Sequence, residues 1–409
     1  MIAKERNIDF FFGIAIIYFF FNNFLIPQGL LYLFFLTPFF YYWMIKKGVK
    51  NVLGYFFIVL LPYFVVHLSV GVDLFYYFKS VVLYLLTYII VYTFYVYLKE
   101  NTGKLERVYG KIVLLNFAMT IVAVIAFFTP LKEFFWYSKN LTHNITNISR
   151  LMMLTYEPSY YSTLLVPIVL YYFLGFFVKR YTPRQVAFLL IFIGIPLLIS
   201  FSLGVLSSLT FAMVVTFLFF FKTLMKSRKV LYTVTGSTAL VLFAFITLLV
   251  VYPDNPLFLR IEDIFAGEDT SGKGRTFEAW KLSFQMIELK SYWFGCGLGQ
   301  MKVVGEEVVR VYYKYQIDDI PIIRIPSVTG ETISVFGITG IVARFVLEFY
   351  FFFKTKVYRN YYRFSLFAYI FLYQFTGSYL TNIAEYVIWV IAFVPGFHDF
   401  DKKQKTVST

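Results

Sequence analysis

Cysteine, histidine and charge are all scarce in this chain. Its 409 residues include one cysteine, Cys296, and three histidines, His67, His143 and His398. A single cysteine excludes an internal disulfide or a thiolate metal cluster, and three histidines leave little for a zinc or haem site. Only 15% of the residues are charged, whereas 59% are hydrophobic and 23% aromatic, with a mean hydropathy of +0.70. A soluble domain could not cover this much apolar surface, so the sequence predicts a polytopic membrane protein.

The few charges that are present have a sign bias, with 37 lysines and arginines against 23 acidic residues and a net charge of +14. In so apolar and aromatic a chain this excess excludes nucleic-acid binding and indicates the membrane topology instead. Seven basic segments hold 23 of the 37 cations, namely Met1–Arg6, Lys46–Lys50, Lys99–Lys111, Lys179–Arg184, Lys222–Lys229, Lys354–Arg363 and Lys402–Lys405. The positive-inside rule places these segments and both termini in the cytoplasm, which requires an even number of spans. No small-residue cleavage site follows the first apolar run, so this run is predicted to be retained as a span.

Apolar runs approaching the roughly 20 residues needed to cross a bilayer predict twelve membrane spans. They cover residues 8–25, 29–45, 52–70, 80–98, 112–129, 156–178, 187–201, 204–221, 230–251, 331–353, 364–378 and 382–397. The expected fold is an all-α, polytopic integral membrane helix bundle, a single transmembrane domain over residues 1–409. One external segment, residues 252–330 between the ninth and tenth spans, holds 11 of the 23 acidic residues and is expected to form a subdomain. No internal repeat or heptad pattern is found.

The 252–330 loop contains a predicted amphipathic helix over residues 276–289. Trp280, Phe284 and Ile287 recur at i, i+4 and i+7 and form its apolar face. A glycine-rich turn with two cations, Lys273 and Arg275, directly precedes this helix.

Unpaired N–H groups and the positive dipole end at such a helix start favour a phosphate. Arginine can offer a phosphate a two-pronged donor fork. An ordinary solvated turn explains the same residues equally well. Beyond the helix, glycines at 295, 297 and 299 permit a tight, close-packed turn.

Five short motifs occur between residues 150 and 340. They are Arg150-x6-Glu157-Pro158-Ser159, Ser200-Phe201-Ser202-Leu203-Gly204, Gly274-Arg275-x4-Trp280, Trp293-Phe294-Gly295-x-Gly297-x-Gly299 and Ser327-x9-Gly337-Ile338-Thr339-Gly340. In this order, and with the large external loop, they resemble the signature of the bacterial O-antigen polymerase and ligase superfamily. Two positions depart from the ligases, because Ser327 stands where ligases carry a histidine and Leu203 where many carry an arginine. The absence of the histidine favours a polymerase over a ligase.

The resemblance implies a GT-C-like membrane glycosyltransferase in the cytoplasmic (inner) membrane, with its active loop on the periplasmic or external side. Such an enzyme moves a growing glycan from undecaprenyl pyrophosphate onto the next lipid-linked repeat unit, with inversion and without metal or cofactor. Its expected partners are the lipid-linked glycan, membrane lipid and a chain-length regulator protein.

The resemblance also implies roles for particular residues. Arg275 and Arg150 would stabilise the departing pyrophosphate, because arginine supplies positive charge where negative charge develops. Arg260, Arg324 and Lys273 are further external cations. Glu157, at the outer mouth of a span, could deprotonate the acceptor hydroxyl, or it could simply be a carboxylate at a helix start. His143 is a second candidate base, and the aromatic rings of Tyr160, Tyr161 and Trp280 could stack on sugars or pack internally.

Charged residues also occur inside the predicted spans. Arg344 and Glu348 stand at i, i+4 on one helix face, and an intramembrane ion pair is costly enough to face the bundle interior. A structural pair is the favoured interpretation, and an extension of a cationic track toward lipid phosphate is the alternative. His67, Asp73, Lys79 and Glu385 lie near outer ends of spans, where they could line the same cavity or sit at the interface.

Three other functions stay open at this point. A ligase would deliver the glycan to another lipid acceptor. A lipid-linked oligosaccharide flippase or other transporter should have paired halves and charges spread through many spans. A chain-length-regulating subunit should have a coiled-coil external domain.

Overall fold

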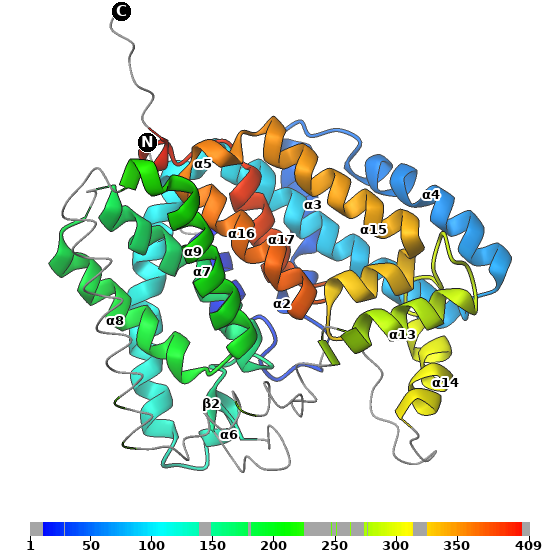
Figure 1. The fold of residues 1–409 in the computed structure, drawn as a ribbon, viewed down its shortest axis with the longest axis horizontal. Coiled ribbons are helices and arrows are strands. Elements are labelled where there is room, and N and C mark those ends of the chain that lie inside the picture. The colour runs from blue at the N-terminus through cyan, green and yellow to red at the C-terminus, as the bar shows by residue number, and fades with distance from the viewer. Residues whose placement is uncertain are drawn as a thin grey trace, which may run out of the picture. The chain divides into compact units, whose positions relative to one another are not determined.

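A computed structural model describes residues 11–27, 29–138, 149–178, 181–224, 274–275, 277–313 and 325–402, together with residues 247, 251 and 262. The regular secondary structure of these residues is helical, apart from short antiparallel pairings of β1 (Trp136–Tyr137) with β2 (Arg150–Leu151) and of Asn360 with Asp401. The predicted all-α class is confirmed for this part of the chain (Figure 1).

The chain divides into two units. Unit 1 comprises Met1–Glu106, Lys273–Val357 and Ile370–Gly396, and unit 2 comprises Arg107–Gly272, Tyr358–Tyr369 and Phe397–Thr409. The assignment of residues 1–409 to one domain, with 252–330 as a subdomain, stays a prediction.

Five described helices are long and apolar enough to cross a membrane. They are α4 (Val52–Val70), α5 (Leu74–Ala126), α7 (Pro158–Phe177), residues Leu203–Phe221 of α9 (Leu203–Leu224), and α15 (Val328–Lys354). Shorter apolar helices cover Phe11–Phe21, Ala187–Ile199 and Ile383–Phe393. The membrane character is supported by these helices, and the total of twelve spans stays a prediction, since most of the span predicted at 230–251 lies outside the described residues.

One predicted loop is helical. The basic segment Lys99–Lys111 was expected to be a loop between two spans, but within α5 (Leu74–Ala126) it is helical on both sides of a kink. The interruption is a single residue, Asn101, whose φ of −133° and ψ of 27° are non-helical. Lysine, glutamate and arginine are good helix formers, so a charged segment between two apolar runs can continue a helix while its side chains remain in water. Each arm of α5 exceeds the roughly 20 residues of a span.

Unit 1 is built around α15 and the segments of the large loop. Besides α4 and the first arm of α5 it contains η1 (Ile17–Phe21), α2 (Tyr32–Phe35), α3 (Thr37–Lys46), α13 (Phe277–Glu288), α14 (Met301–Tyr313), the last turns of α16 (Tyr361–Thr376), and α17 (Ile383–Phe393). In Figure 1, α13 lies along the first half of α15 and α14 beside α13. Their shared core includes Met286 of α13, Val308 of α14 and Val335 of α15.

The helix predicted at 276–289 is confirmed as α13, but its buried face differs from the expected one. The fully buried side chains are Ala279, Leu282, Ser283, Met286 and Ile287. The predicted Trp280 and Phe284 are only half-buried and pack at the margin against Ile333 and Ile341 of α15. Periodicity identified an amphipathic helix, yet which positions are most buried depends on the partners, and here α13 packs against two hydrophobic clusters.

The central helix of unit 2 is α7, most of whose residues are buried. It packs against α8 (Pro183–Ile199) and α9. Asn116 of α5 joins two of these helices, because its Oδ1 accepts from the Tyr161 hydroxyl at 2.7 Å and its Nδ2 donates to the Phe192 carbonyl at 3.2 Å. The remaining elements of unit 2 are α6 (Lys132–Phe135), the start of α16, and η4 (His398–Phe400), and η3 (Val357–Arg359) lies at the unit boundary.

Candidate functional site

A glycine-rich loop of unit 1 inserts its backbone into a break in α15. Gly337 interrupts this helix with a φ of 68° and a ψ of −162°. On the N-terminal side of the break, the Ser334 and Val335 carbonyls accept from the N–H groups of Cys296 and Gly297, at 2.8 and 3.1 Å. On the other side, the N–H groups of Ile338 and Thr339 donate to the carbonyls of Tyr292 and Trp293, at 3.2 and 3.1 Å. The loop therefore satisfies the backbone groups that the break leaves without helical partners.

Only glycine fits at the contact between this loop and the break in α15, which is called the interlock below. Gly295 and Gly297 have φ of 79° and 101°, values that favour glycine. A Cβ on Gly295 would lie 2.5 Å from the Val335 carbonyl, and one on Gly337 would lie 2.4 Å from the Trp293 carbonyl. The glycine turn expected after α13 is confirmed, and its partner is the Gly337 segment of α15.

Two further contacts attach this loop to the turn between α4 and α5. His67, buried on α4, bonds through Nε2 to the Phe294 carbonyl at 2.7 Å and through Nδ1 to the Tyr77 hydroxyl at 3.1 Å. Because the carbonyl can only accept, Nε2 carries the proton and Nδ1 accepts from the tyrosine. The Gln300 side chain exchanges two hydrogen bonds with the Asp73 backbone, at 2.8 and 3.0 Å. His67 and Asp73, left open by the sequence, thus hold the loop in place.

Cys296 contributes to the same contact. Its thiol donates to the Ser334 carbonyl at 2.9 Å, and burial raises the pKa of the thiol to about 12. The sulfur is therefore a protonated structural donor rather than a nucleophile.

Arg275 lies two residues before Phe277, the first residue of α13. The turn predicted at 271–276 is partly helical, because Gly274 and Arg275 already have helical backbone. The guanidinium is half-buried, and no described residue forms a hydrogen bond or ion pair with it. Trp280, one turn further on, stacks on Phe375 of α16, with ring centroids 6.1 Å apart and an interplanar angle of 11°. Arg275 and Trp280 therefore belong to unit 1, with the tryptophan ring engaged in packing.

The other described candidates belong to unit 2. Glu157 is the residue before α7, half-buried, and its Oε1 accepts from the Ser159 hydroxyl. Arg150 lies in β2, with its guanidinium 5.1 Å from the centroid of the Tyr137 ring. Tyr160 is 1% exposed and packs on Tyr156, with centroids 4.8 Å apart. The contact of Glu157 matches a helix-start carboxylate, and its role as a base stays a prediction.

Four sequence candidates lie outside the described residues. They are Arg260, Lys273, Arg324 and His143.

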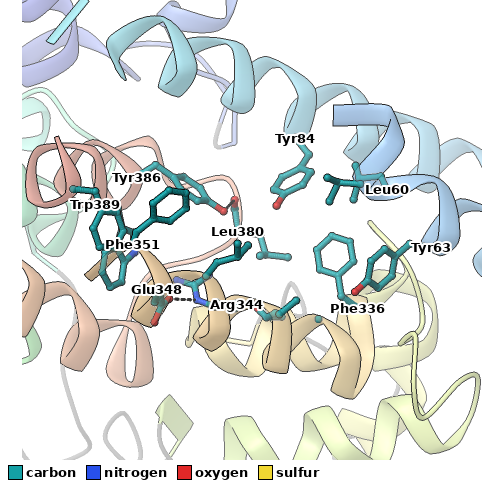
Figure 2. A pocket seen from close by; sticks show the side chains of 16 residues that line it. Leu60, Tyr63, Tyr84, Phe336, Arg344, Glu348, Phe351, Leu380, Tyr386 and Trp389 are labelled. Carbon is teal, nitrogen blue, oxygen red and sulfur yellow. Dashed lines mark hydrogen bonds and ion pairs between the residues drawn. The ribbon is translucent and has the colours of Figure 1, made fainter. Parts of the chain in front are cut away.

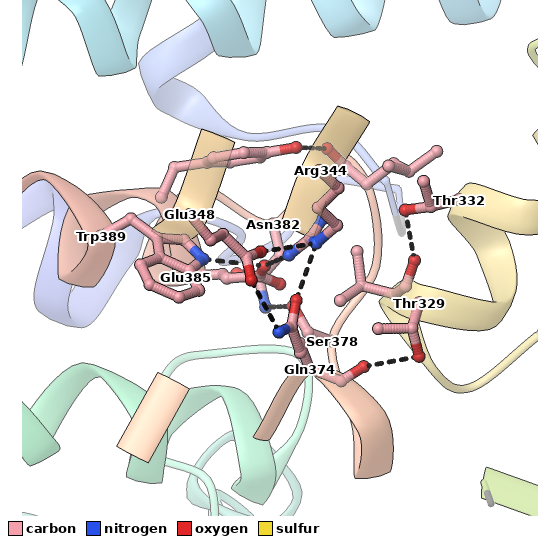
Figure 3. Close-up of polar contacts among 12 residues, drawn as sticks. Thr329, Thr332, Arg344, Glu348, Gln374, Ser378, Asn382, Glu385 and Trp389 are labelled. Atoms are coloured by element: carbon pink, nitrogen blue, oxygen red, sulfur yellow. Dashed lines mark hydrogen bonds and ion pairs between the residues drawn. The ribbon is translucent and has the colours of Figure 1, made fainter. Parts of the chain in front are cut away.

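The predicted Arg344–Glu348 pair is confirmed and is part of a larger buried cluster on α15, α16 and α17 (Figure 3). Arg344 Nε lies 3.0 Å from Glu348 Oε1 and donates to Gln374 Oε1 at 2.7 Å, while Nη2 donates to Glu385 Oε1. Gln374 returns a bond to Glu348 Oε2 at 3.0 Å, and Trp389 Nε1 donates to Glu385 at 3.3 Å. Arg344 thus forms ion pairs with both carboxylates of the cluster, which supports the structural pair favoured from the sequence.

The sequence did not predict that Gln374 and Glu385 belong to the cluster of Arg344. Their polarity within predicted apolar spans was a signal for a buried polar site. Their meeting with Arg344 could not be inferred, because helices contact one another at positions that helical periodicity within one segment does not specify.

An apolar cavity of about 290 Å³ borders the cluster. Figure 2 shows Tyr63, Tyr84 and Phe336 at one end, Phe351, Tyr386 and Trp389 at the other, and the Arg344–Glu348 pair on its wall. A second cavity of about 250 Å³ adjoins it and shares four lining residues, Val59, Leu60, Tyr84 and Tyr386. Together they form a space between α4, α5, α15 and α17 that is almost entirely apolar apart from the ion pair.

No model of a known protein family, no curated protein and no solved structure matches this chain. The superfamily resemblance therefore remains a hypothesis that rests on the motifs.

Proposed function

We propose that this protein is an integral membrane glycosyltransferase that polymerises a bacterial surface polysaccharide of the O-antigen type. It would transfer the growing glycan from undecaprenyl pyrophosphate onto the next lipid-linked repeat unit. The observation that carries the proposal is the interlock of two motifs that resemble the superfamily, residues 293–299 and 337–340. The backbone contact between the two motifs depends on their glycines. The glycines that carry the resemblance are therefore also the residues that hold the two motifs together.

The loop contacts are consistent with the topology that this function requires. From the basic segments, the turn between α4 and α5 is predicted to be external, on the same side as the 252–330 loop. Lys290 Nζ donates to the Gly71 carbonyl in this turn at 2.9 Å, and Gln300 binds Asp73 beside it. The turn between α4 and α5 and the 252–330 loop, each predicted to be external from the basic segments, are thus in contact.

In the proposed reaction, a pyrophosphate dianion or trianion leaves the sugar at the membrane surface. Arg275 would stabilise it, because a guanidinium that has no partner among the described residues and lies at a helix start can give both of its donor edges to phosphate oxygens. Arg150 is the second proposed cation and Glu157 the proposed base for the acceptor hydroxyl. Lys273, Arg260, Arg324, Trp280 and Tyr160 are proposed for substrate binding.

Ser327 favours a polymerase over a ligase. It stands where the resembling ligases carry a histidine, and it caps α15, since its hydroxyl accepts from the Gly330 N–H at 3.4 Å and pairs with the Thr329 hydroxyl at 2.9 Å. At this position the chain therefore has a helix cap and lacks the imidazole that could act as a base in the ligases.

The test is incubation of the purified protein with lipid-linked repeat units alone. A ladder of products without nucleotide sugar, ATP or added metal supports the polymerase. A reaction that starts only when a second lipid acceptor is supplied identifies a ligase. No glycan transfer under either condition contradicts the proposal.

Arg275→Lys is expected to impair chain extension although the charge is kept, because lysine cannot form the bidentate fork. Loss of one desolvated charge-assisted contact costs of order 2–4 kcal/mol, or roughly thirty- to several-hundred-fold in rate. Glycan ladders at matched protein levels measure the effect. Arg310→Lys on α14, the same change elsewhere in the loop, is the control and should leave ladders unchanged. Wild-type ladders from the Arg275 variant would exclude the phosphate role.

Topology provides a separate test. A reporter fused at Glu306 of α14 is expected to be external and one fused at Lys104 cytoplasmic. A cytoplasmic signal at Glu306 would place the proposed active loop in the wrong compartment.

A transporter is the second candidate, and one observation favours it. Arg344, Glu348 and Glu385 meet inside an apolar helix cluster next to a cavity, and buried charges in membrane helices frequently mark transport pathways. Movement of lipid-linked oligosaccharide across liposomes without ladder formation would establish this alternative.

A further inference from the structure

The cluster on α15, α16 and α17 carries an unbalanced charge. It contains one guanidinium, on Arg344, and two carboxylates, on Glu348 and Glu385. The side chains are 12%, 7% and 0% exposed, respectively. With all three ionised the cluster has a net charge of −1, which is costly for a group removed from water within an apolar helix cluster.

No other described group supplies the missing positive charge. The titratable side chains that act on the cluster from neighbouring positions are Tyr84 of α5 and Tyr386 of α17, and Glu331 of α15 acts on Tyr84. Two of these are phenols and the third is a further carboxylate, which accepts the Leu380 N–H at 2.7 Å. The local surroundings therefore do not compensate the excess negative charge.

One atom of the cluster has a free place for a ligand. Both oxygens of Glu348 have partners, since Oε1 forms an ion pair with Arg344 Nε and Oε2 accepts from Gln374 Nε2. Glu385 Oε1 accepts from Arg344 and Trp389, but Glu385 Oε2 is fully buried and has no hydrogen-bond partner among the residues that the structure describes. A buried carboxylate oxygen without a donor is energetically unfavourable, because it has lost its hydrogen bonds to water.

We propose that this cluster binds one monovalent cation, a proton or an alkali-metal ion, at the Glu385 carboxylate. One positive charge neutralises the cluster and occupies the free oxygen, and a divalent ion would reverse the imbalance. The apolar cavity borders this site, since Arg344 and Glu348 line it (Figure 2). The site is independent of the glycosyl transfer proposed above.

The consequence is that the packing of α15, α16 and α17 depends on the cation. When it is bound, Arg344 and Gln374 hold a neutral cluster together. When it is absent, two carboxylates share one guanidinium and repel each other, which favours separation of α17 from α15.

The test measures unfolding of the purified full-length protein at several pH values, in sodium, potassium or choline chloride at constant ionic strength. If the ligand is a proton, the unfolding equilibrium constant rises about tenfold per pH unit wherever the native cluster keeps a proton that the unfolded chain has lost. If it is an alkali ion, the constant falls about tenfold for each tenfold rise in that ion above its dissociation constant, with choline inactive.

Glu385→Gln is the decisive variant, because the amide keeps the shape and the acceptor for Arg344 while removing the excess charge. We expect it to lose the dependence found in the wild type. Glu306→Gln, the same change on the exposed face of α14, should retain it. Equal dependence in the wild type and Glu385→Gln, or no cation dependence in the wild type, would overturn the proposal.

A second measurement does not require the variant to fold. Infrared difference spectra of the wild type should show either a protonated carboxylic acid lost as the pH is raised, or a carboxylate band that shifts when choline is replaced by sodium or potassium. The absence of both changes would also overturn the proposal. Glycan ladders play no part in these measurements, so their outcome is separate from that of the polymerase test.

Discussion

Gly295→Ala is expected to destabilise unit 1 strongly. The residue has a φ of 79°, and a left-handed conformation costs an L-residue roughly 1–2 kcal/mol. The new Cβ would also lie 2.5 Å from the Val335 carbonyl and 2.6 Å from the Gly337 nitrogen. Backbone atoms cannot rotate away as side chains do, so the clash adds about 1–3 kcal/mol. A total of about 2–5 kcal/mol is a large part of the 5–15 kcal/mol that stabilises a typical domain.

Unfolding of the detergent-solubilised protein and the yield of folded protein in membranes measure this effect. Gly54→Ala on α4 is the matched control, because its Cβ would find its nearest neighbour at an ordinary 3.8 Å. Alanine is also the better helix former by about 1 kcal/mol, so this variant should be as stable as the wild type or slightly more so. Normal stability of the Gly295 variant would mean that the loop does not occupy the break of α15.

Arg344→Met is expected to destabilise the protein by about 3–5 kcal/mol, the typical cost of removing one partner from a buried ion pair. Methionine fills much of the same volume, so the loss comes from the two carboxylates that remain. Glu348 and Glu385 would keep only the donors of Gln374 and Trp389. The shift in the unfolding midpoint, in native membranes or a lipid nanodisc, measures the loss.

A compensated variant separates the charge effect from general disruption. Arg344→Met combined with Glu348→Leu and Glu385→Leu removes every charge of the cluster, and apolar replacement of a whole buried ion cluster is often neutral or stabilising. We expect this triple variant to recover most of the lost stability. A single variant that unfolds at the wild-type midpoint would contradict the buried ion-pair geometry.

Much of the local structure follows from sequence patterns. Long apolar runs predict α4, α7 and α15 because a helix is the way in which a single segment satisfies its backbone hydrogen bonds in lipid. The i, i+4 spacing of Arg344 and Glu348 brings them together on any α-helix, and the structure confirms the pair. The glycine spacing at 295–299 likewise predicts a turn, since few other residues adopt positive φ.

The composition and these spacings thus determined by themselves the helical class, the membrane character, the helices' places along the chain and the existence of a close-packed glycine turn. Only the tertiary structure decided that this turn fills the break at Gly337, that His67 holds it, and that Glu385 completes the charge cluster of Arg344. It also decided that α5 continues through a basic segment. The reason is physical: periodicity specifies which residues of one helix share a face, whereas the partner that covers this face comes from a segment distant in the chain, through packing and hydrogen bonds that no local pattern encodes.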